Sequence, residues 1–278
     1  MAARATMNRV DEAFRNKPIF MPYFPLGYPD LETSIAVIET LAKNGADLIE
    51  VGLSFSDPLA DGPVNQKAMQ RALENGITIA KSLDAVAELR QRGVEIPLVL
   101  MGYYNPILAF GLEKFICGAE SAGADGFIIP DLPIEESDEF TRAGHIRKEQ
   151  KALGDSSLPI IWMLAPTTPS ERMEKIARGA QGFIYLVSVT GVTGARQSVA
   201  DGLAGLIGRV REHTSIPVCV GFGIGTPEQA REVGTMADGV IIGSACVRYI
   251  GESRKPVQAA RDFAKSFHTA LLEIKHAQ

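Results

Sequence analysis

Two short signatures alternate four times along this chain of 278 residues, and each stands directly before an apolar run. The first signature is a single proline, at Pro18, Pro97, Pro159 and Pro217. The second is an alanine followed by a polar residue, with glycine before the alanine in three of the four copies: Gly-Ala-Asp at 45–47 and 123–125, Gly-Ala-Gln at 179–181 and Met-Ala-Asp at 236–238. Proline suits the first residue of a strand, and glycine supplies the left-handed turn that ends a helix. The alternation therefore predicts eight short, buried, parallel strands.

The segments between the predicted strands have helical periodicity. Apolar residues recur three or four positions apart, as in the stripes Leu31, Ile35, Ile38, Leu41 and Phe263, Phe267, Leu271, Ile274. Alternating strand and helix units favour a parallel sheet, and eight of them favour a single-domain (β/α)8 TIM barrel over residues 1–278. An open doubly wound sheet remains the alternative, because strand order is not visible in a sequence. We expect residues 1–16 to form an extra N-terminal helix that caps the bottom of the barrel, and residues 141–157 to form a polar extension of the fourth helix.

Composition narrows the classes of function. The chain is 46% hydrophobic and 22% charged, and its net charge of −5 without a basic block gives no electrostatic footprint for nucleic acid. No apolar run approaches the roughly 18 residues that a membrane span needs, and residues 1–18 lack the apolar core of a signal peptide. The three cysteines, Cys117, Cys219 and Cys246, are too scattered for a disulfide framework or a zinc site. We therefore expect a cytoplasmic protein.

The active site of such a barrel is built by the loops that follow the strands. The second predicted strand carries Glu50, and its loop carries Asp57 and Asp61. Burial disfavours the anion of a glutamate and raises its pKa, so Glu50 could act as both acid and base near neutral pH. A structural ion pair with a lysine or arginine is an equal alternative for Glu50. Asp57 is more simply explained by turn chemistry, whereas the concentration of carboxyl groups favours a function for Asp61.

Glycine-bearing loops follow the sixth, seventh and eighth predicted strands. They contain Gly191 and Gly194, then Gly223, then Gly243 with Ser244. The loops after strands 7 and 8 commonly bind phosphate in this fold, through backbone N–H groups and the N-terminus of a short helix. Each glycine alone could simply form a turn, but the succession of loops predicts a phosphate site.

Other polar residues near strand ends give weaker signals. Tyr103 and Asp131 could line the pocket, although a tyrosine there often only packs. The four histidines lie on helical or polar segments and are predicted to be surface residues: His145, His213, His268 and His276. We therefore expect no metal site and no histidine-based catalysis.

The chain resembles the α-subunit family of tryptophan synthase. The resemblance is carried by IEVGLSFSDPLADGP at 49–63, MGYYNP at 101–106, PDLPIEE at 130–136 and GVTG at 191–194. It implies a lyase that splits indole-3-glycerol phosphate into indole and glyceraldehyde 3-phosphate, with no cofactor on this chain. It also implies a β-subunit partner that carries pyridoxal phosphate and receives the indole within an α2β2 heterotetramer. The chain departs from the family pattern at Ser54, where proline is usual, and in its longer segment 141–157.

The resemblance also assigns roles to residues. Glu50 takes the proton-shuttling role and Asp61 that of the second carboxylate. Residues implied in substrate binding are Tyr23, Tyr103, Asp131, Tyr185, Thr193 and Phe222, and those implied in phosphate binding are Gly194, Gly223, Gly243 and Ser244. Three alternatives remain: a stand-alone lyase that releases free indole, a non-catalytic phosphate-binding barrel, and an isomerase on the same barrel.

Overall fold

Eight parallel strands form one sheet in the order β4-β3-β2-β1-β8-β7-β6-β5. The computed structural model describes residues 8–151, 158–188, 196–221 and 223–275. The strands are β1 (Ile19–Pro25), β2 (Ile49–Gly52), β3 (Leu98–Met101), β4 (Gly126–Ile128), β5 (Met163–Leu164), β6 (Ile184–Val187), β7 (Val218–Gly221) and β8 (Gly239–Ile242). All eight coincide with or overlap the apolar runs that the proline and Gly-Ala-Asp signatures predict. The prediction of a (β/α)8 barrel is confirmed, and the open-sheet alternative is wrong.

The sheet closes between β4 and β5 through a single parallel bridge, Phe127 to Ile160. Two backbone hydrogen bonds make it: Phe127 N–H donates to Pro159 O over 2.9 Å, and Ile161 N–H donates to Phe127 O over 2.8 Å. The sequence predicts a strand over 159–164, but β5 itself contains only Met163 and Leu164. The fifth strand is therefore interrupted, because residues 160 and 163–164 pair with different neighbours.

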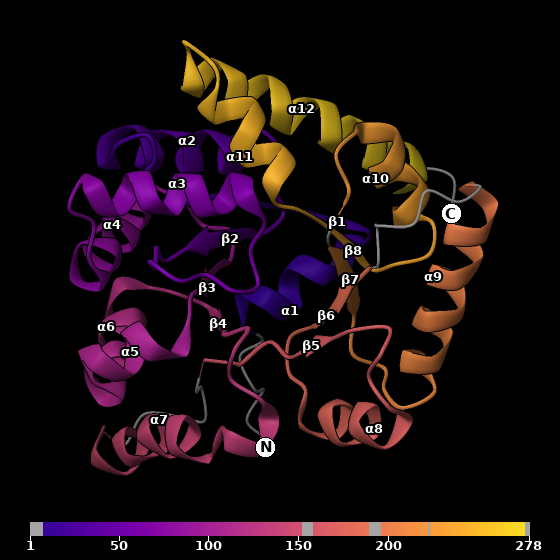
Figure 1. Ribbon diagram of the computed structural model, residues 1–278, viewed down its shortest axis with the longest axis horizontal. Coiled ribbons are helices and arrows are strands. Elements are labelled where there is room, and N and C mark those ends of the chain that lie inside the picture. Colours follow the sequence, from indigo (N-terminus) through magenta and orange to yellow (C-terminus); the bar gives the residue numbers. More distant parts are fainter. Residues whose placement is uncertain (1–7, 152–157, 189–195, 222, 276–278) are drawn as a thin grey trace, which may run out of the picture.

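Helices surround the strands as a ring, which Figure 1 shows nearly end-on. They are α2 (Leu31–Lys43), α3 (Pro63–Glu74), α4 (Ile79–Gln91), α5 (Tyr104–Phe110), α6 (Leu112–Ala122), α7 (Asp138–Lys151), α8 (Ser170–Gly179), α9 (Arg196–Arg211), α10 (Pro227–Gly234), α11 (Ser244–Gly251) and α12 (Pro256–Lys275). The predicted apolar stripes are the buried faces of α2 and α12. Two helices instead of one follow β2, β3 and β8; α5 and α11 begin directly after β3 and β8, whereas the loop 53–62 separates α3 from β2. No helix in the described ranges is long and apolar enough to cross a membrane.

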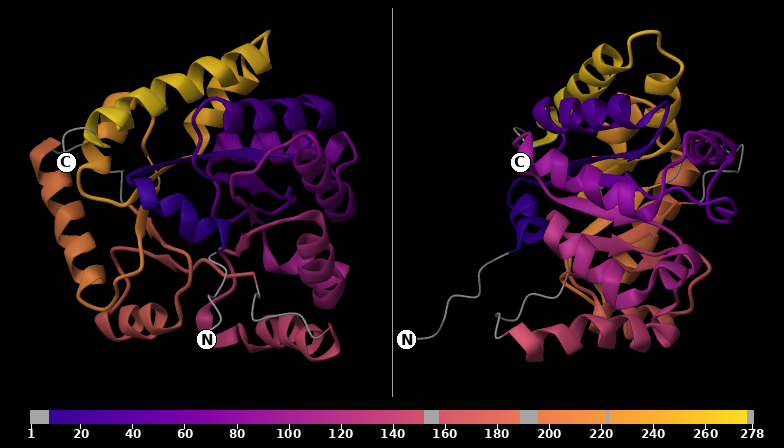
Figure 2. Two further views of the ribbon diagram at one scale, coloured as in Figure 1. Left: turned by 180° about the vertical axis from the view of Figure 1, so that it is seen from behind. Right: turned by 90° about the vertical axis from the view of Figure 1, so that its left-hand side faces the viewer.

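A short helix lies across the amino-terminal end of the strands. It is α1 (Arg9–Ala13), continued by a 3-10 turn, η1 (Phe14–Asn16), and the view from behind in Figure 2 places it in front of the sheet. Phe14 packs on Phe183, just before β6, with ring centroids 5.8 Å apart. The predicted N-terminal helix over 1–16 thus begins at Arg9 within the described part of the chain, and residues 1–7 lie outside it. The predicted extension at 141–157 is helical as far as Lys151.

The aspartates of the repeated signature join neighbouring strands at the same end of the barrel. Each carboxylate accepts a hydrogen bond from a backbone N–H near the start of the preceding strand, and each aspartate N–H donates back to the carbonyl of that same residue. The pairs are Asp47 with Phe20, Asp125 with Leu98, and Asp238 with Val218. The repeat therefore forms a two-way clasp between adjacent strands in three of its four copies. In the third copy along the chain the aspartate is replaced by Gln181, which is exposed.

Cations neutralise the two most buried of these carboxylates. Asp125 pairs with Arg90 and with Arg9, the latter over 2.9 Å. Asp238 pairs with Lys17 over 2.6 Å and with Arg211 over 3.1 Å. Burial by itself would raise the pKa of Asp238, but the hydrogen bonds from Lys17, Val218 N–H and Arg211 lower it overall.

We expect the substitution Asp125→Asn to lower the free energy of unfolding by about 3 kcal/mol, because a partly buried arginine loses its counter-charge. Arg90 is only 14% exposed, so water cannot replace the lost carboxylate oxygen fully. Urea denaturation at pH 7 measures the effect. The matched control is Asp84→Asn on the same helix as Arg90, where the side chain is exposed. Equal stability of the two variants would contradict the structural role of the clasp.

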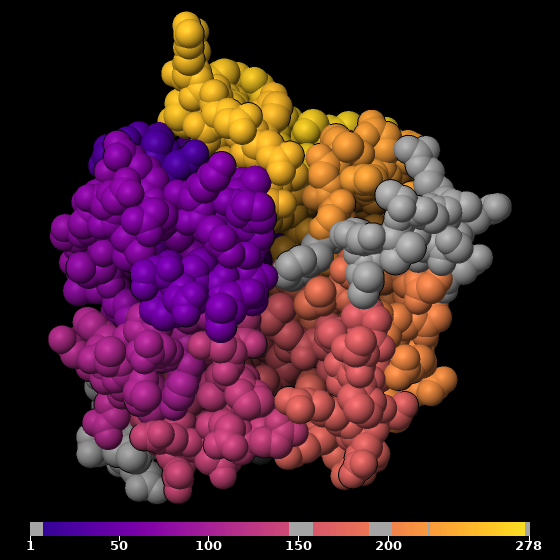
Figure 3. Space-filling model, in the orientation of Figure 1, coloured from indigo at the N-terminus to yellow at the C-terminus, as the bar shows by residue number. Residues whose placement is uncertain are grey.

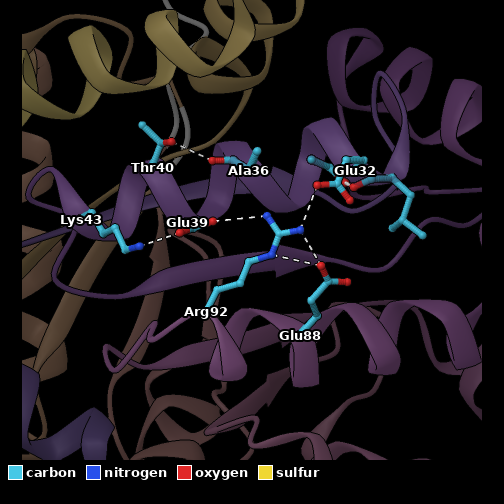
Figure 4. A network of polar contacts seen from close by, with 9 residues as sticks. Glu32, Ala36, Glu39, Thr40, Lys43, Glu88 and Arg92 are labelled. Atoms are coloured by element: carbon cyan, nitrogen blue, oxygen red, sulfur yellow. Dashed lines mark hydrogen bonds and ion pairs between the residues drawn. The ribbon is translucent and has the colours of Figure 1, made fainter.

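A network of half-buried and exposed charged side chains links α2 and α4 on the outside of the barrel (Figure 4). Arg92 contacts Glu32 over 2.8 Å, Glu39 over 3.3 Å and Glu88, and Glu39 also pairs with Lys43. Exposed ion pairs contribute little individually, about 0–1 kcal/mol each. These contacts therefore fix the packing of two helices and supply no chemistry.

Candidate active site

Glu50 lies in the middle of β2 and points into the barrel. In the parallel register it stands opposite Tyr23 of β1 and Val99 of β3. The residue is only 1% exposed. The negative charge of ionised Glu50 raises the pKa of Tyr185 on β6, so the two side chains lie near each other. Since β1, β8 and β7 stand between β2 and β6 in the sheet, these two side chains can face each other only across the interior.

Burial changes the acid–base behaviour of Glu50. Loss of solvation, with a smaller contribution from the negative charge of Asp61, raises the pKa of Glu50 to about 8. At neutral pH the group therefore holds a proton, yet it can release one without a large free-energy cost. The structural ion pair considered for Glu50 is absent from the described part of the structure, where no lysine or arginine contacts it.

The raised pKa predicts a pH-dependent cost to stability. In the unfolded chain a glutamate ionises near its ordinary pKa, whereas folded Glu50 keeps its proton up to about pH 8. Between these values the folded state binds more protons, so stability falls as pH rises. We expect Glu50→Gln to be more stable than the wild type by about 3 kcal/mol at pH 7, and by almost nothing at pH 4. Thermal or urea unfolding at both pH values measures this, and an equal difference at both would contradict it.

Asp61 is held between two donors at the start of α3. Tyr103 donates its hydroxyl to Oδ2 over 2.7 Å, and Asn65 donates its amide to Oδ1 over 2.8 Å. Tyr103 in turn accepts the Ala60 N–H over 3.0 Å. Burial and then the bond to Asp61 raise the pKa of the Tyr103 hydroxyl, which therefore stays a donor. Tyr103 does more than pack, because it orients the Asp61 carboxylate.

Two further tyrosines complete the interior of the site. Tyr23 and Tyr185 are buried, and burial raises the pKa of each well above the ordinary value, with Glu50 and Asp61 adding to the effect. Each ring lies against a glycine of the neighbouring strand. A Cβ built at Gly52 would stand 2.5 Å from the Tyr23 hydroxyl oxygen, and a Cβ built at Gly221 would stand 2.5 Å from the Tyr185 hydroxyl oxygen. The two glycines therefore make room for the two rings.

Three buried side-chain atoms have no hydrogen-bond partner in the described part of the chain. They are the Tyr23 hydroxyl oxygen, Glu50 Oε1 and Asn65 Oδ1. Buried polar atoms are almost always paired, so an unpaired one needs an explanation. All three lie close together in one group: Asn65 donates a hydrogen bond to Asp61, and the charges of Asp61 and Glu50 both raise the pKa of Tyr23. A ligand that supplies polar groups at this point would satisfy them.

The glycine loops after β7 and β8 lie next to each other and next to this group. A Cβ built at Gly225 would lie 3.9 Å from Ala245 Cβ, and one at Gly243 would lie 4.0 Å from Asn65 Nδ2. Helix α11 begins at Ser244 with Gly243 as its cap residue, and no side chain caps its first turn. Gly223 adopts a positive φ of 76°, which favours glycine. Free N–H groups at a helix start are suited to an anion.

The remaining predicted residues are less informative. Asp131 is exposed and accepts the Tyr104 N–H over 2.8 Å, so it caps the start of α5. Thr193, Gly194 and Phe222 lie outside the described residues. Among the residues described, no group of three or more histidine, cysteine or acidic side chains could hold a metal ion. His268, predicted to be on the surface, is half-buried against Gly45.

Sequence reasoning missed Asn65. Its signal is its spacing: it follows Asp61 by four positions, and α3 begins between them at Pro63. One helical turn therefore brings its amide back to the carboxylate. Nothing in the sequence alone distinguishes this asparagine from a surface residue of the helix, although it is 9% exposed.

The barrel brings a protonated carboxyl, a second carboxylate and an uncapped helix start together at the carboxyl ends of its strands. Figure 3 shows that the surface on this side is hollowed near its middle, between the purple and the orange parts of the chain. Fold and site together are those of a (β/α)8-barrel enzyme equipped for acid–base catalysis on an anionic substrate.

Comparison with known proteins narrows this class. The model of the tryptophan synthase alpha chain family matches residues 10–275. The chain is 48% identical over 248 residues to the tryptophan synthase alpha chain of Chloroflexus aggregans, which is 87% of this chain and 89% of the relative. It is 44% identical over 267 residues to that of Roseiflexus sp., 94% of this chain and 99% of the relative. The crystal structure of the alpha subunit from Legionella pneumophila is similar with a TM-score of 0.85 at 37% identity, over 96% of this chain and 100% of that one.

The chain belongs to the tryptophan synthase alpha chain family. It is a lyase of tryptophan biosynthesis that cleaves indole-3-glycerol phosphate into indole and glyceraldehyde 3-phosphate. The predicted family, reaction and enzyme class are therefore confirmed, and neither the stand-alone lyase nor the non-catalytic barrel is favoured.

Proposed function

We propose that Glu50 moves both protons of this cleavage. Breaking the bond between indole C3 and the glycerol chain requires a proton added at C3 and a proton removed from the hydroxyl on the adjacent glycerol carbon. The protonated carboxyl of Glu50 supplies the first proton. The resulting carboxylate accepts the second as the carbon–carbon bond breaks, which leaves an aldehyde and indole and restores the acid. The observation that carries this proposal is the buried, unpartnered Glu50 Oε1 of a group whose pKa is raised to about 8.

Asp61 is proposed to stabilise the intermediate electrostatically. Protonation at C3 places positive charge on the indole ring nitrogen, and a nearby carboxylate favours that charge. The hydrogen bonds from Tyr103 and Asn65 support this role, because they hold both oxygens in place before the substrate binds. Such preorganisation avoids the cost of reorienting the group during the reaction.

The phosphate end of the substrate is proposed to bind at the start of α11, by Gly243 and Ser244, together with Gly223 from the loop after β7. Support comes from the uncapped first turn of α11 and from the adjacency of the two loops. Tyr23 and Tyr185 are proposed to enclose the ring of the substrate, with Thr193, Phe222 and Asp131 as further substrate contacts. Gly194 is proposed to contribute to the phosphate site. We propose that the chain works without a cofactor of its own, which is consistent with the family, and the proposed steps use none.

We further propose that the chain works with a β subunit in a cytoplasmic α2β2 complex. The family implies a β partner, which would carry pyridoxal phosphate and accept the indole. The loop after β2 offers an exposed apolar contact, because Leu59 is 81% exposed, and Leu108 on α5 is 47% exposed. These residues flank the motif positions near Pro58 and Asn105 that resemble the partner-facing surface of the family.

Indole release from indole-3-glycerol phosphate, followed with and without a co-purified β subunit, tests the function. We expect release by the chain alone and a faster rate in the complex. A chain that cleaves nothing under either condition would contradict the proposed chemistry. A rate indifferent to a β subunit that demonstrably binds would contradict only the coupling.

A further inference from the structure

We propose that Asn65 is a positioning residue with two separate tasks: its amide N–H fixes the Asp61 carboxylate, and its carbonyl oxygen binds the middle hydroxyl of the glycerol chain. The inference rests on the proposed function of Asp61 and extends it to the part of the substrate between the indole ring and the phosphate.

The first task follows from the two bonds that Asp61 receives. Tyr103 occupies Oδ2 and Asn65 occupies Oδ1, at 2.7 and 2.8 Å. The donors come from different elements: Tyr103 lies in the loop that follows β3, and Asn65 lies in the first turn of α3. Together they fix the plane of the carboxylate. Because an ionised carboxylate only accepts hydrogen bonds, the atom of Asn65 that faces it must be the amide nitrogen.

The second task follows from the other end of the same side chain. Once Nδ2 faces Asp61, Oδ1 must point away from it, and this atom is buried without a partner in the described residues. A carbonyl oxygen can only accept, so what satisfies it must bring an O–H or N–H group. The phosphate is excluded as its partner, because phosphate oxygens at neutral pH are acceptors themselves.

Position selects the hydroxyl. The Asn65 amide borders both the Asp61 carboxylate and the phosphate loop, because its Nδ2 bonds Asp61 and would lie 4.0 Å from a Cβ at Gly243. The substrate carries two hydroxyls between its ring and its phosphate. Glu50 takes the proton of the one next to the ring, and the middle one lies nearer the phosphate. The middle hydroxyl is therefore the donor that Oδ1 accepts.

Two substitutions separate the tasks. Asn65→Leu removes both the donor and the acceptor at similar volume, whereas Asn65→Asp removes the donor and keeps an acceptor. The second probe is a deoxy substrate, 3-hydroxy-3-(indol-3-yl)propyl phosphate, which lacks only the middle hydroxyl and can still be cleaved. The readouts are kcat for indole release and the ratio of kcat/KM between the two substrates, measured with the β subunit present.

We expect the wild type to prefer the full substrate by about tenfold, the value of one buried hydrogen bond. Asn65→Leu should lower kcat by about tenfold or more and reduce the preference to less than about twofold. Asn65→Asp should lower kcat as well but keep the preference, because its oxygen still accepts. A merely structural residue would change the rate for both substrates equally and leave their ratio unchanged.

Gln258→Leu serves as the matched control, because it removes an exposed amide on α12 that bonds only Asp262. Thermal unfolding confirms that each variant is folded. If the leucine variant fails to fold, the kcat of the isosteric Asn65→Asp still tests the positioning of Asp61, and a wild type without preference for the full substrate overturns the hydroxyl contact. An undiminished preference in Asn65→Leu overturns the hydroxyl contact, and an undiminished kcat overturns the positioning of Asp61. Absence of cleavage by the wild type would instead refute the proposed function itself.

Discussion

Replacing Glu50 by glutamine is expected to lower kcat for indole release by about 1,000-fold or more, while substrate affinity changes only a few-fold. Glutamine has nearly the same shape and keeps a polar group in the same place, so binding contacts survive. It cannot give or take a proton at neutral pH, so both proposed transfers stop. Rapid-quench measurement of indole formation gives the rate, and binding of unreacted substrate to the variant gives the affinity.

The control for this experiment is Glu95→Gln, the same change at an exposed position outside the site. A rate near that of the wild type in Glu50→Gln would remove Glu50 from the mechanism. A variant that lost affinity and rate in equal proportion would show that Glu50 binds the substrate and does not move its protons. The pH profile of the wild type offers an independent check, since activity should change around the pKa of about 8.

Asp61→Asn is expected to lower kcat by about 100-fold, in the range found when one electrostatic contact to a transition state is removed. The substitution removes the negative charge proposed to face the indole nitrogen. It also turns one acceptor oxygen into an amide, so either Tyr103 or Asn65 would face another donor. Steady-state kinetics with the isolated chain measure the loss.

Asp57→Asn is the matched control for Asp61, because it makes the same change four positions earlier in the same loop on an exposed side chain. Equal losses in both variants would indicate a general effect on the loop. A rate reduced less than about threefold in Asp61→Asn would contradict its proposed electrostatic role.

The residues of the site lower the stability of the folded chain. A carboxyl group without water or a counter-ion destabilises the folded chain, and the buried unpaired atoms of Tyr23 and Asn65 add to this. The aspartate clasps at the opposite end of the barrel, with their arginine and lysine partners, are fully paired instead. The carboxyl ends of the strands thus carry the unpaired groups that a substrate can use, and the amino ends carry stabilising pairs.

Much of the fold was predictable from local chemistry. Proline before an apolar run and glycine after an amphipathic helix are short-range signals, and they locate the starts of β1, β3 and β7 to within a residue. Glu50 was recognisable for a similar reason, because a charged residue inside an apolar strand is rare. The glycines of the loops after β7 and β8 were visible in the same way. The β5 strand was predicted too long, because its pairing depends on two neighbours that periodicity cannot identify.

What the sequence alone determined was therefore the number and order of the strands, the family, and which strand ends carry reactive side chains. Only the tertiary structure decided that β4 and β5 close the barrel through Phe127 and Ile160, and that Tyr185 faces Glu50 across it. It also decided that Tyr103 and Asn65 hold Asp61 from two sides. The reason is physical: local signals report the conformation of a few neighbouring residues, whereas burial, pKa and hydrogen-bond partners depend on groups brought together from distant parts of the chain.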